Sequence, residues 1–226
     1  MSMFLIYDAE NAEYLLQPAG YGILAVLLLA LLAAILVPGG RKTPAGEAGS
    51  RKTKEMVFCA AAIALAMVSS TYLKLGSLPF GGSITLFSML FVTLIGYFYG
   101  ARTGIMAGMA YGILQLITGP YIYAPLQVLL DYPLAFGALG LSGLFRDRRH
   151  GLVTGYSVGV AGRYICHVIS GYVFFAEYAP EGMNPLVYTL QYNLTYILPE
   201  MAATIVVLCV PAMARAIGQV KRQALE

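Results

Sequence analysis

The sequence predicts an all-α, polytopic membrane protein, and three observations lead to this fold class. Apolar residues make up 59% of the 226 residues and charged residues only 11%, with a mean hydropathy of +0.73. Seven apolar segments approach the ~20 residues that a membrane-spanning helix needs. Basic residues cluster beside these segments, a pattern typical of loops that orient helices in a membrane. We expect a six-helix bundle preceded by one extra N-terminal helix.

Each segment is dominated by Leu, Ile, Val, Ala, Phe and Gly, and the seven follow one another along most of the chain. In order they are Tyr21–Val37, Met56–Leu75, Ile84–Tyr99, Thr103–Thr118, Pro125–Phe145, Leu152–Phe175 and Val187–Ala216. Between the first and second segments the chain is rich in Gly, Pro, Ala and basic residues, a composition typical of a flexible linker. We therefore expect an N-terminal transmembrane helix in residues 1–38, a basic cytoplasmic linker in 39–54 and a six-helix membrane domain in 55–226.

The charges beside the segments predict how the helices cross the membrane, because cytoplasmic loops carry an excess of Lys and Arg. The first segment has acidic residues before it and basic residues after it, so it is an N-out helix rather than a cleaved signal peptide. The later basic loops all fall on the cytoplasmic side, with Lys74 the exception, and Glu177 and Glu181 fall outside. We expect the N-terminus outside and the C-terminus in the cytoplasm. The basic sites that agree are Lys52, Lys54, Arg102, Arg146, Arg148, Arg149, Arg215, Lys221 and Arg222.

Small residues recur every fourth position in several segments and place a smooth stripe on one helix face. Tight packing within the bundle is the favoured interpretation, and a surface for a partner is the alternative. The pair Ala62 and Ala66 has the same spacing and is equally ambiguous. The glycines concerned are Gly96, Gly100, Gly104, Gly108, Gly112, Gly151, Gly155 and Gly159.

Several kinds of chemistry are disfavoured by the sequence. Cys59, Cys166 and Cys209 lie in apolar stretches without a C-x-x-C spacing, which argues against a disulfide framework and a metal site. The chain has no H-E-x-x-H motif and no ATP-binding G-x-x-x-x-G-K-[ST] motif, and no nucleic-acid motif. We expect no enzyme activity, no cofactor and no nucleic-acid partner. Active transport would need energy from a partner or an ion gradient.

Four acidic, basic or histidine residues lie in the interior of the predicted spans: Asp131, Arg163, His167 and Glu200. Lys74 and Arg215 lie at span ends. A carboxylate in hydrocarbon costs at least about 2.5 kcal/mol, so Asp131 should face the protein interior. Arg163 and His167 are four residues apart and share a helix face. A structural ion pair between Asp131 and Arg163 and a ligand site both remain open on spacing alone. Glu200 follows Pro199, where it could satisfy the backbone or pair with Arg163.

Aromatic and amide residues gather near the outward ends of the same helices. A membrane-interface belt explains many such residues without any ligand. A carboxylate, tyrosines and an amide together would also suit a flat, cationic heteroaromatic solute, through stacking, cation–π attraction and charge-assisted hydrogen bonds. We favour a pocket of this kind. The residues are Tyr121, Tyr123, Tyr132, Tyr172, Phe174, Phe175, Tyr178, Tyr188, Tyr192 and Asn193.

Four strings of sequence resemble one known family. They are Phe80-Gly-Gly-Ser-Ile-Thr-Leu-Phe-Ser-Met-Leu90, Gly112-Ile-Leu-Gln-Leu116, Gln127-Val-Leu-Leu-Asp-Tyr-Pro-Leu-Ala-Phe136 and Tyr192-Asn-Leu-Thr-Tyr-Ile-Leu-Pro-Glu200. On these strings the chain resembles the ThiT family, the thiamine-specific substrate-binding subunits (S components) of energy-coupling factor (ECF) transporters. The resemblance covers about Glu55–Ala216, almost the whole predicted six-helix unit.

The resemblance implies a protein of the bacterial cell membrane that captures thiamine outside and releases it inside. It implies partners in an ECF module, namely two ATPase subunits that use the ATP and a transmembrane coupling protein. Carried over by position, the substrate-binding residues are Asp131, Tyr132, Tyr121, Arg163, His167, Phe175, Tyr188 and Asn193. The small-residue face at Ala62 and Ala66 would dock to the coupling protein.

The chain departs from the family pattern in two ways. It has no Trp, and Phe175 stands where some relatives stack a tryptophan on the vitamin, so stacking could be shared with Tyr172. The N-terminal helix is an addition to the six-helix core. Alternative functions are an S component for another vitamin or for the precursor hydroxymethylpyrimidine, and a non-transporting membrane scaffold with a purely structural Asp131–Arg163 pair. An intramembrane enzyme is a weaker third alternative.

Overall fold

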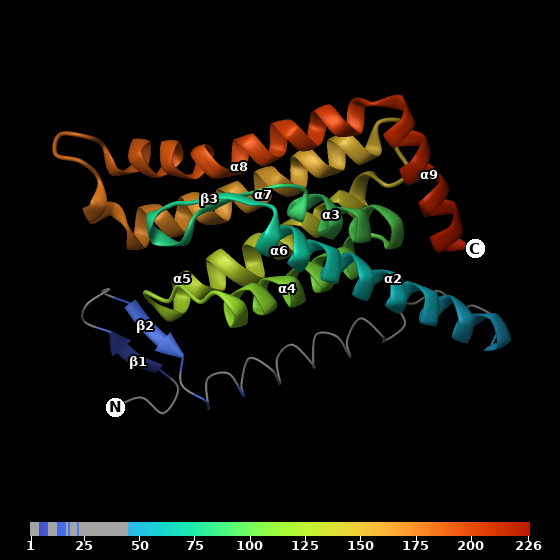
Figure 1. The fold of residues 1–226 in the computed structure, drawn as a ribbon, viewed down its shortest axis with the longest axis horizontal. Coiled ribbons are helices and arrows are strands. Elements are labelled where there is room, and N and C mark those ends of the chain that lie inside the picture. Colours follow the sequence, from blue (N-terminus) through green and yellow to red (C-terminus); the bar gives the residue numbers. More distant parts are fainter. Residues whose placement is uncertain (1–4, 9–12, 17, 19–21, 23–44) are drawn as a thin grey trace.

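The computed structural model describes residues 5–8, 13–16, 18, 22 and 45–226, and helices dominate this part of the chain (Figure 1). The predicted first span, Tyr21–Val37, lies outside the described residues except for Gly22. Before it, strands β1 (Leu5–Asp8) and β2 (Glu13–Leu16) pair antiparallel, with Leu5 opposite Leu16. The domain division predicted for the N-terminal region stays a prediction.

The remaining elements follow in chain order from the basic linker to the C-terminus. Two short strands, β3 (Lys74–Ser77) and β4 (Ser83–Thr85), form an antiparallel hairpin around the 3-10 turn η1 (Pro79–Gly81). The long helices are α2 (Ala45–Tyr72), α3 (Ser88–Tyr99), α4 (Ala101–Thr118), α7 (Gly151–Phe174), α8 (Pro185–Cys209) and α9 (Pro211–Leu225). One span is composite: α5 (Pro125–Leu129), η2 (Leu130–Leu134), α6 (Ala135–Ala138) and η3 (Leu139–Phe145). A last 3-10 turn is η4 (Ala176–Tyr178).

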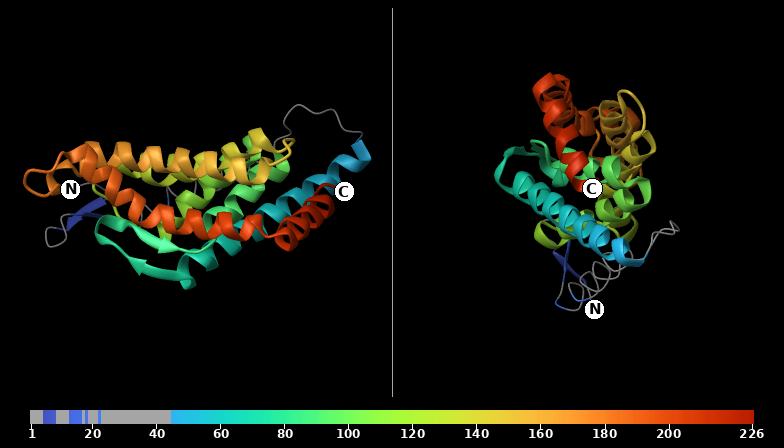
Figure 2. Two further views of the ribbon diagram at one scale, coloured as in Figure 1. Left: turned by 90° about the horizontal axis from the view of Figure 1, so that it is seen from above. Right: turned by 90° about the vertical axis from the view of Figure 1, so that its right-hand side faces the viewer.

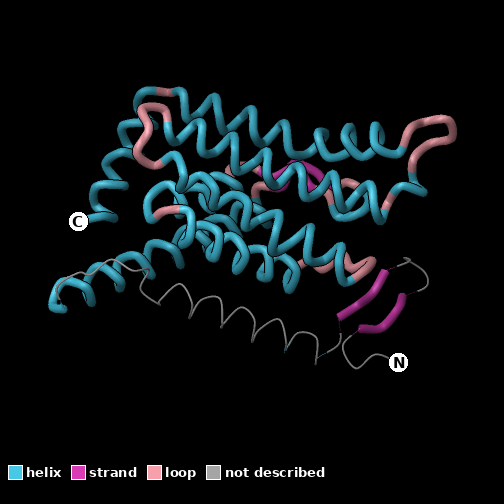
Figure 3. Tube along the Cα trace, turned by 180° about the vertical axis from the view of Figure 1, so that it is seen from behind, coloured by secondary structure: helices cyan, strands magenta, loops and turns pink. Residues whose placement is uncertain are grey.

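Apart from α9, the long helices lie roughly along one axis, and the composite span 125–145 packs among them (Figure 1). It packs against α3, α4 and α7, while α2 packs on α3, and α7 lies beside α8. The turned views show the same elongated bundle, with α9 crossing one end of it beside α2 (Figure 2). Seen from behind, the hairpin β3–β4 is the only strand pair within the bundle among residues 45–226 (Figure 3). The all-α membrane bundle expected from the sequence is confirmed, with small hairpins added.

The glycine stripe of α4 packs directly against the backbone of the composite span. A Cβ atom on Gly104 would lie 2.9 Å from the Cα of Gly140, and one on Gly108 would lie 2.9 Å from the carbonyl carbon of Phe136. One on Gly112 would lie 2.7 Å from the carbonyl carbon of Tyr132. These separations leave no room for a side chain. The packing interpretation is confirmed for this stripe, and the stripe fixes how the composite span sits.

The composite span changes helix type where it carries Asp131. Residues Leu130–Leu134 form a π-helical turn that contains Pro133, and the N–H of Ala135 bonds to the carbonyl of Leu130. Proline has no N–H and its ring collides with the preceding turn of an α-helix, so a wider turn accommodates it. Such π-bulges occur frequently at functional sites because they redirect side chains. Here the bulge presents Asp131 to the interior.

Several predicted boundaries are wrong, each for a local reason. The helix expected at Met56 already begins at Ala45, within the predicted flexible linker. The last predicted span, Val187–Ala216, is two helices, because α8 ends at Cys209 and α9 begins at Pro211. Val210 between them is extended, as the residue before a proline prefers. The hairpin β3–β4 also takes the end of the second predicted span and the start of the third.

Three helices among the described residues are long and apolar enough to cross a membrane: Lys52–Tyr72, Pro125–Phe145 and Pro185–Cys209. Ser88–Tyr99 is apolar but shorter. Helix α4 is glycine-rich and α7 carries Arg163 and His167, which lowers their hydropathy. These helices support the assignment of the chain as a membrane protein. The number of seven spans, and the side of the membrane on which each terminus lies, stay predictions.

Glu200 ties the hairpin β3–β4 and the start of α3 to α8. Its carboxylate is 2% exposed and accepts hydrogen bonds from Thr85 Oγ1 (2.5 Å), Ser88 Oγ (3.0 Å) and the backbone N–H of Met89 (2.9 Å). Residue Phe87 before α3 offers no capping side chain, so Glu200 supplies the acceptor that the first turn of α3 needs. Glu200 is not an ion-pair partner of Arg163 among the described residues.

Replacing Gly108 by alanine tests the glycine stripe. The new methyl group would meet the backbone of Phe136, so we expect the free energy of unfolding to fall by about 1–3 kcal/mol, as for other overpacked interiors. Thermal unfolding in detergent measures the change. Gly218→Ala in α9 is the matched control, because nothing lies within 4 Å of the position that its methyl group would take. Equal unfolding midpoints for the two variants would contradict close packing at Gly108.

Replacing Glu200 by alanine tests the connection between α8 and the hairpin. The loss leaves the Thr85 and Ser88 hydroxyls and the Met89 N–H without their acceptor, which we expect to cost about 2–3 kcal/mol of stability. Glu181→Ala removes a carboxylate from an exposed position and serves as the control. A Glu200→Ala protein as stable as the control would show that these contacts do not hold the hairpin.

Candidate substrate-binding site

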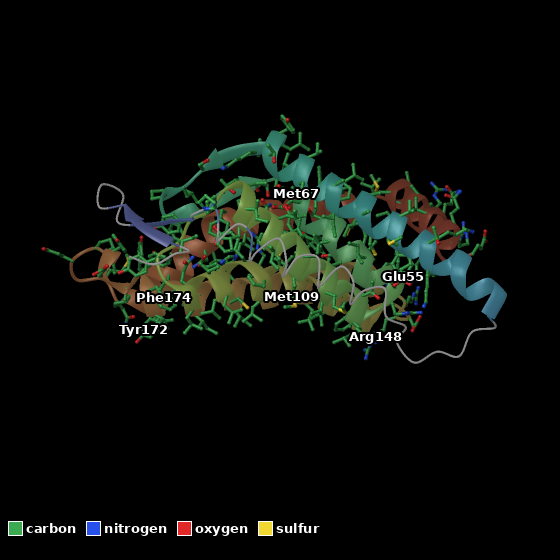
Figure 4. All side chains as sticks on the ribbon, turned by 90° about the horizontal axis from the view of Figure 1, so that it is seen from below. Glu55, Met67, Met109, Arg148, Tyr172 and Phe174 are labelled. Carbon is green, nitrogen blue, oxygen red and sulfur yellow. The ribbon has the colours of Figure 1, made fainter. Side chains whose placement is uncertain are left out.

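A cavity of about 200 Å³ opens within the bundle, bounded by the hairpin β3–β4, the composite span, α7 and α8. It lies toward the end of the bundle opposite α9, the end where Tyr172 and Phe174 are labelled, while Glu55 and Arg148 mark the other end (Figure 4). All eight residues expected from the sequence to bind a substrate line this cavity: Tyr121, Asp131, Tyr132, Arg163, His167, Phe175, Tyr188 and Asn193. The cavity is therefore the candidate site.

Asp131 is the centre of the hydrogen-bond network. Its side chain is 16% exposed, and its oxygens accept from Gln127 Nε2 (2.7 Å) and Ser170 Oγ (2.8 Å) and contact His167 Nδ1 (2.8 Å). Gln127 precedes Asp131 by one helical turn, and Ser170 follows His167 by three residues, so helical spacing aligns both pairs. The carboxylate is thus held in one orientation by neutral donors and one imidazole.

Arg163 does not pair with Asp131. Its Cζ lies 4.3 Å from the centre of the Phe136 ring, a cation–π contact, and its Nε donates to His167 Nε2 at 3.3 Å. The side chain of α7 that contacts Asp131 is instead His167, whose Nδ1 lies 2.8 Å from Asp131 Oδ1. The direct Asp131–Arg163 pair, on which the scaffold alternative rested, is not formed. Arg163 and Asp131 instead contact opposite nitrogens of the same ring.

Aromatic rings form the remaining walls in two groups. Phe175 is 8% exposed and lies with its ring centre 6.0 Å from that of Tyr121. On the α8 side, Tyr192 contacts Tyr188 (6.2 Å) and Tyr196 (5.8 Å). The hydroxyl of Tyr192 donates to the carbonyl of Pro79, which joins this wall to the hairpin. Flat rings on two sides leave a slot that suits a flat ligand.

The amide of Asn193 is fixed on the α8 side of the cavity. Asn193 is 3% exposed, and its Nδ2 donates to the carbonyls of Thr189 (2.9 Å) and His167 (3.4 Å). Its Oδ1 accepts from the hydroxyl of Tyr196 at 2.5 Å. Tyr196 in turn meets the His167 ring edge-on, with ring centres 6.0 Å apart. These contacts link Asn193, Tyr196 and His167 into one rigid part of the wall.

Sequence analysis did not identify several residues that line the cavity. The wider aromatic group that it named also includes residues that do not line the cavity. Gln127, Ser170 and Tyr196 were missed, although each lies three or four residues from an expected site residue on the same helix. Tyr172 is 52% exposed and does not line the cavity, so it does not share stacking with Phe175. Among the aromatic residues that the sequence analysis grouped near the outward helix ends, Tyr123, Phe174 and Tyr178 also do not line the cavity.

Two further sequence patterns are explained by packing. Ala62 and Ala66 are 5% and 0% exposed and belong to the hydrophobic core, which fits internal packing of that spacing. Docking of this face to a coupling protein stays a prediction. The string Gly155-Tyr-Ser-Val-Gly159 matches the G-x-S-x-G pattern of hydrolases, but it lies inside α7. A nucleophile elbow requires a strand-to-helix turn, so this string indicates no catalytic serine.

No cluster of three or more His, Cys, Asp or Glu side chains that could hold a metal ion occurs in the described part of the chain. The chemistry that the cavity offers is that of a binding site: the carboxylate of Asp131, the side-chain amides of Gln115, Gln127 and Asn193, and aromatic rings. Such a site can fix the edge of a heteroaromatic ring by hydrogen bonds and hold its faces by stacking.

Comparison with known proteins gives a consistent family. The model of the family described as Thiamine transporter protein (Thia_YuaJ) matches residues 56–218. The thiamine transporter ThiT of Bacillus subtilis is 35% identical over 167 residues, which cover 68% of this chain and 85% of that protein. ThiT of Lacticaseibacillus paracasei is 37% identical over 118 residues, which cover 45% of this chain and 59% of that protein.

A solved structure of ThiT from Listeria monocytogenes has a similar fold, with a TM-score of 0.58 and 24% identity. The similarity covers 72% of this chain and 97% of that one. The residues that the family model matches include all those that line the cavity. The family consists of transporters rather than enzymes. The chain belongs to the thiamine transporter protein family.

Proposed function

We propose that the chain binds thiamine in the cavity around Asp131 and serves as the substrate-binding subunit of an ECF transporter. The observation that carries the proposal is the convergence of the eight expected residues, which come from segments up to 72 positions apart, on one cavity. A membrane scaffold has no need of such a cavity. Family membership makes thiamine the ligand to test first.

The chemistry of the cavity suits both halves of thiamine. The vitamin joins a permanently cationic thiazolium ring to an aminopyrimidine, so it offers one charge, two flat rings and an edge of donors and acceptors. Asp131 supplies an ionised acceptor, and the rings of Tyr188, Tyr192 and Phe175 supply faces for stacking and cation–π attraction. Asn193 is held in place to meet a polar ring edge.

The partners of the proposed transporter are those that the resemblance to the ThiT family implies: two separate ATPase subunits and a transmembrane coupling protein. The sequence given contains no ATP-binding G-x-x-x-x-G-K-[ST] motif, which fits ATP use by separate subunits. Helix α9, which carries Arg215 and Lys221, lies at the end of the bundle away from the cavity, and Lys221 donates to the carbonyl of Arg146. Under the positive-inside rule this distribution of charge supports a cavity that faces outside and a C-terminus in the cytoplasm.

A thiamine titration of the purified protein in detergent tests the proposal. Tyrosine fluorescence is available as an intrinsic signal, because the chain has 17 Tyr and no Trp. Saturable one-site binding supports the proposal, and its absence by both fluorescence and calorimetry would refute it. Competition with hydroxymethylpyrimidine separates a thiamine subunit from one for the precursor, because that compound lacks the thiazolium charge.

Replacing Asp131 by asparagine should weaken thiamine binding by about 2–3 kcal/mol, the loss expected for a desolvated charge-assisted contact. The control is Asp147→Asn, since the Asp147 side chain is 86% exposed and lies in the loop after the composite span. Calorimetric titration of both variants provides the comparison. Wild-type affinity in Asp131→Asn would remove this carboxylate from the site.

A further inference from the structure

The two nitrogens of the His167 ring make different contacts, and together these contacts fix its protonation. Arg163 Nε, which is always a donor, lies 3.3 Å from His167 Nε2. Nε2 must therefore present its lone pair. The ring proton then resides on Nδ1, which lies 2.8 Å from Asp131 Oδ1 and donates to it. A second proton on Nε2 would place two donors and two positive charges face to face.

We infer that Arg163 is a positioning residue that keeps His167 neutral, so that the ring wall of the cavity offers an uncharged imidazole to a cationic ligand. The inference rests on the proposed function for its ligand, but its structural part concerns the protein alone. The guanidinium is itself held on the Phe136 ring at 4.3 Å, which fixes the direction of its Nε. Arg163 thus acts on the ligand through His167.

The groups that face His167 come from three elements. Asp131 reaches it from η2, Arg163 from its own helix α7, and Tyr196 from α8 with ring centres 6.0 Å apart. Glu200 on α8 is occupied by Thr85, Ser88 and the N–H of Met89. The wider cavity adds other titratable side chains: Lys74, Tyr121, Tyr132, Tyr188 and Tyr192. Among all of these, Arg163 is the group that occupies Nε2.

If His167 stays neutral, the affinity for thiamine should depend little on pH. An imidazole without such a partner takes up a second proton between about pH 5 and pH 8. An imidazolium in this wall would repel a thiazolium ring and would strengthen its own pairing with Asp131, both of which oppose binding. Burial of the His167 ring and the donation of Arg163 to its Nε2 both oppose this protonation, so thiamine affinity should stay nearly constant across that range.

Nitrogen NMR of ligand-free protein labelled at histidine tests the assignment directly. The chain has only two histidines, so His150→Gln leaves the signals of His167 alone. We expect a protonated Nδ1 and an unprotonated Nε2 that persists on acidification. A proton on Nε2 in the wild-type protein would overturn the inference, whether or not thiamine binds. Failure of thiamine to bind, in contrast, would refute the proposed function and leave this measurement unaffected.

Thiamine titrations at about pH 7.5 and about pH 5.5 test the consequence. We expect the wild-type dissociation constant to change little and that of Arg163→Met to rise by about tenfold on acidification, since Nε2 is then free to take a proton. Arg163→Lys keeps a cationic donor and should restore the flat profile. Lys74→Met removes another cation of the cavity wall that does not contact His167, and its profile should stay flat.

An Arg163→Met profile as flat as that of the wild type would contradict the inference. So would equal acid sensitivity in Lys74→Met, because the effect would then belong to the overall charge of the cavity. Unfolding midpoints of each variant establish that the titrations compare folded proteins. If Arg163→Met does not fold, the wild-type NMR signals and the Arg163→Lys titration still decide the question.

Discussion

The carboxylate of Asp131 lies inside an apolar span, and its burial sets the constraint on which the surrounding structure depends. A charge in such a setting is stable only if its oxygens are hydrogen-bonded. Gln127, Ser170 and His167 supply these bonds from two elements of the bundle. The π-helical turn around Pro133 presents the carboxylate to them, and the glycine stripe of α4 brings the composite span into place. The packing that holds the bundle together therefore also positions the carboxylate in the site.

A second buried carboxylate organises the other side of the cavity. Glu200 accepts from Thr85, Ser88 and the N–H of Met89, and so joins α8 to the hairpin and to the first turn of α3. Asp131 and Glu200 have different tasks, since one lines the cavity and the other lies behind the hairpin that lines it. Both show how an ionisable residue within an apolar segment is retained when the fold provides donors for it.

The contacts of Arg163 show that the two opposite charges in the site do not pair with each other. On sequence alone, Asp131 and Arg163 were two opposite charges that could neutralise each other. In the structure His167 lies between them, with one nitrogen toward each. The ring thereby becomes a fixed neutral element between a negative and a positive group. A cationic ligand can then meet the carboxylate and the aromatic walls without an imidazolium beside it.

Composition, apolar segments and the family strings are local properties of the chain, so the amino-acid sequence was enough to predict the membrane class, the helical architecture, the family and eight of the residues that line the cavity. Single-residue features were less visible. The break at Val210–Pro211 and the π-turn at Pro133 each contain a proline, and the hairpin β3–β4 contains the turn residues Pro79, Gly81 and Gly82. None of these residues by itself specifies the geometry of its turn.

Only the tertiary structure decided which partner each polar side chain has. Asp131 pairs with His167 rather than Arg163, Glu200 caps α3 rather than pairing with Arg163, and Ala62 and Ala66 face the core. Helical spacing shows which residues share a face, but the direction of that face depends on how helices distant in sequence pack. In this bundle that packing is set by glycines whose backbones approach too closely for any side chain.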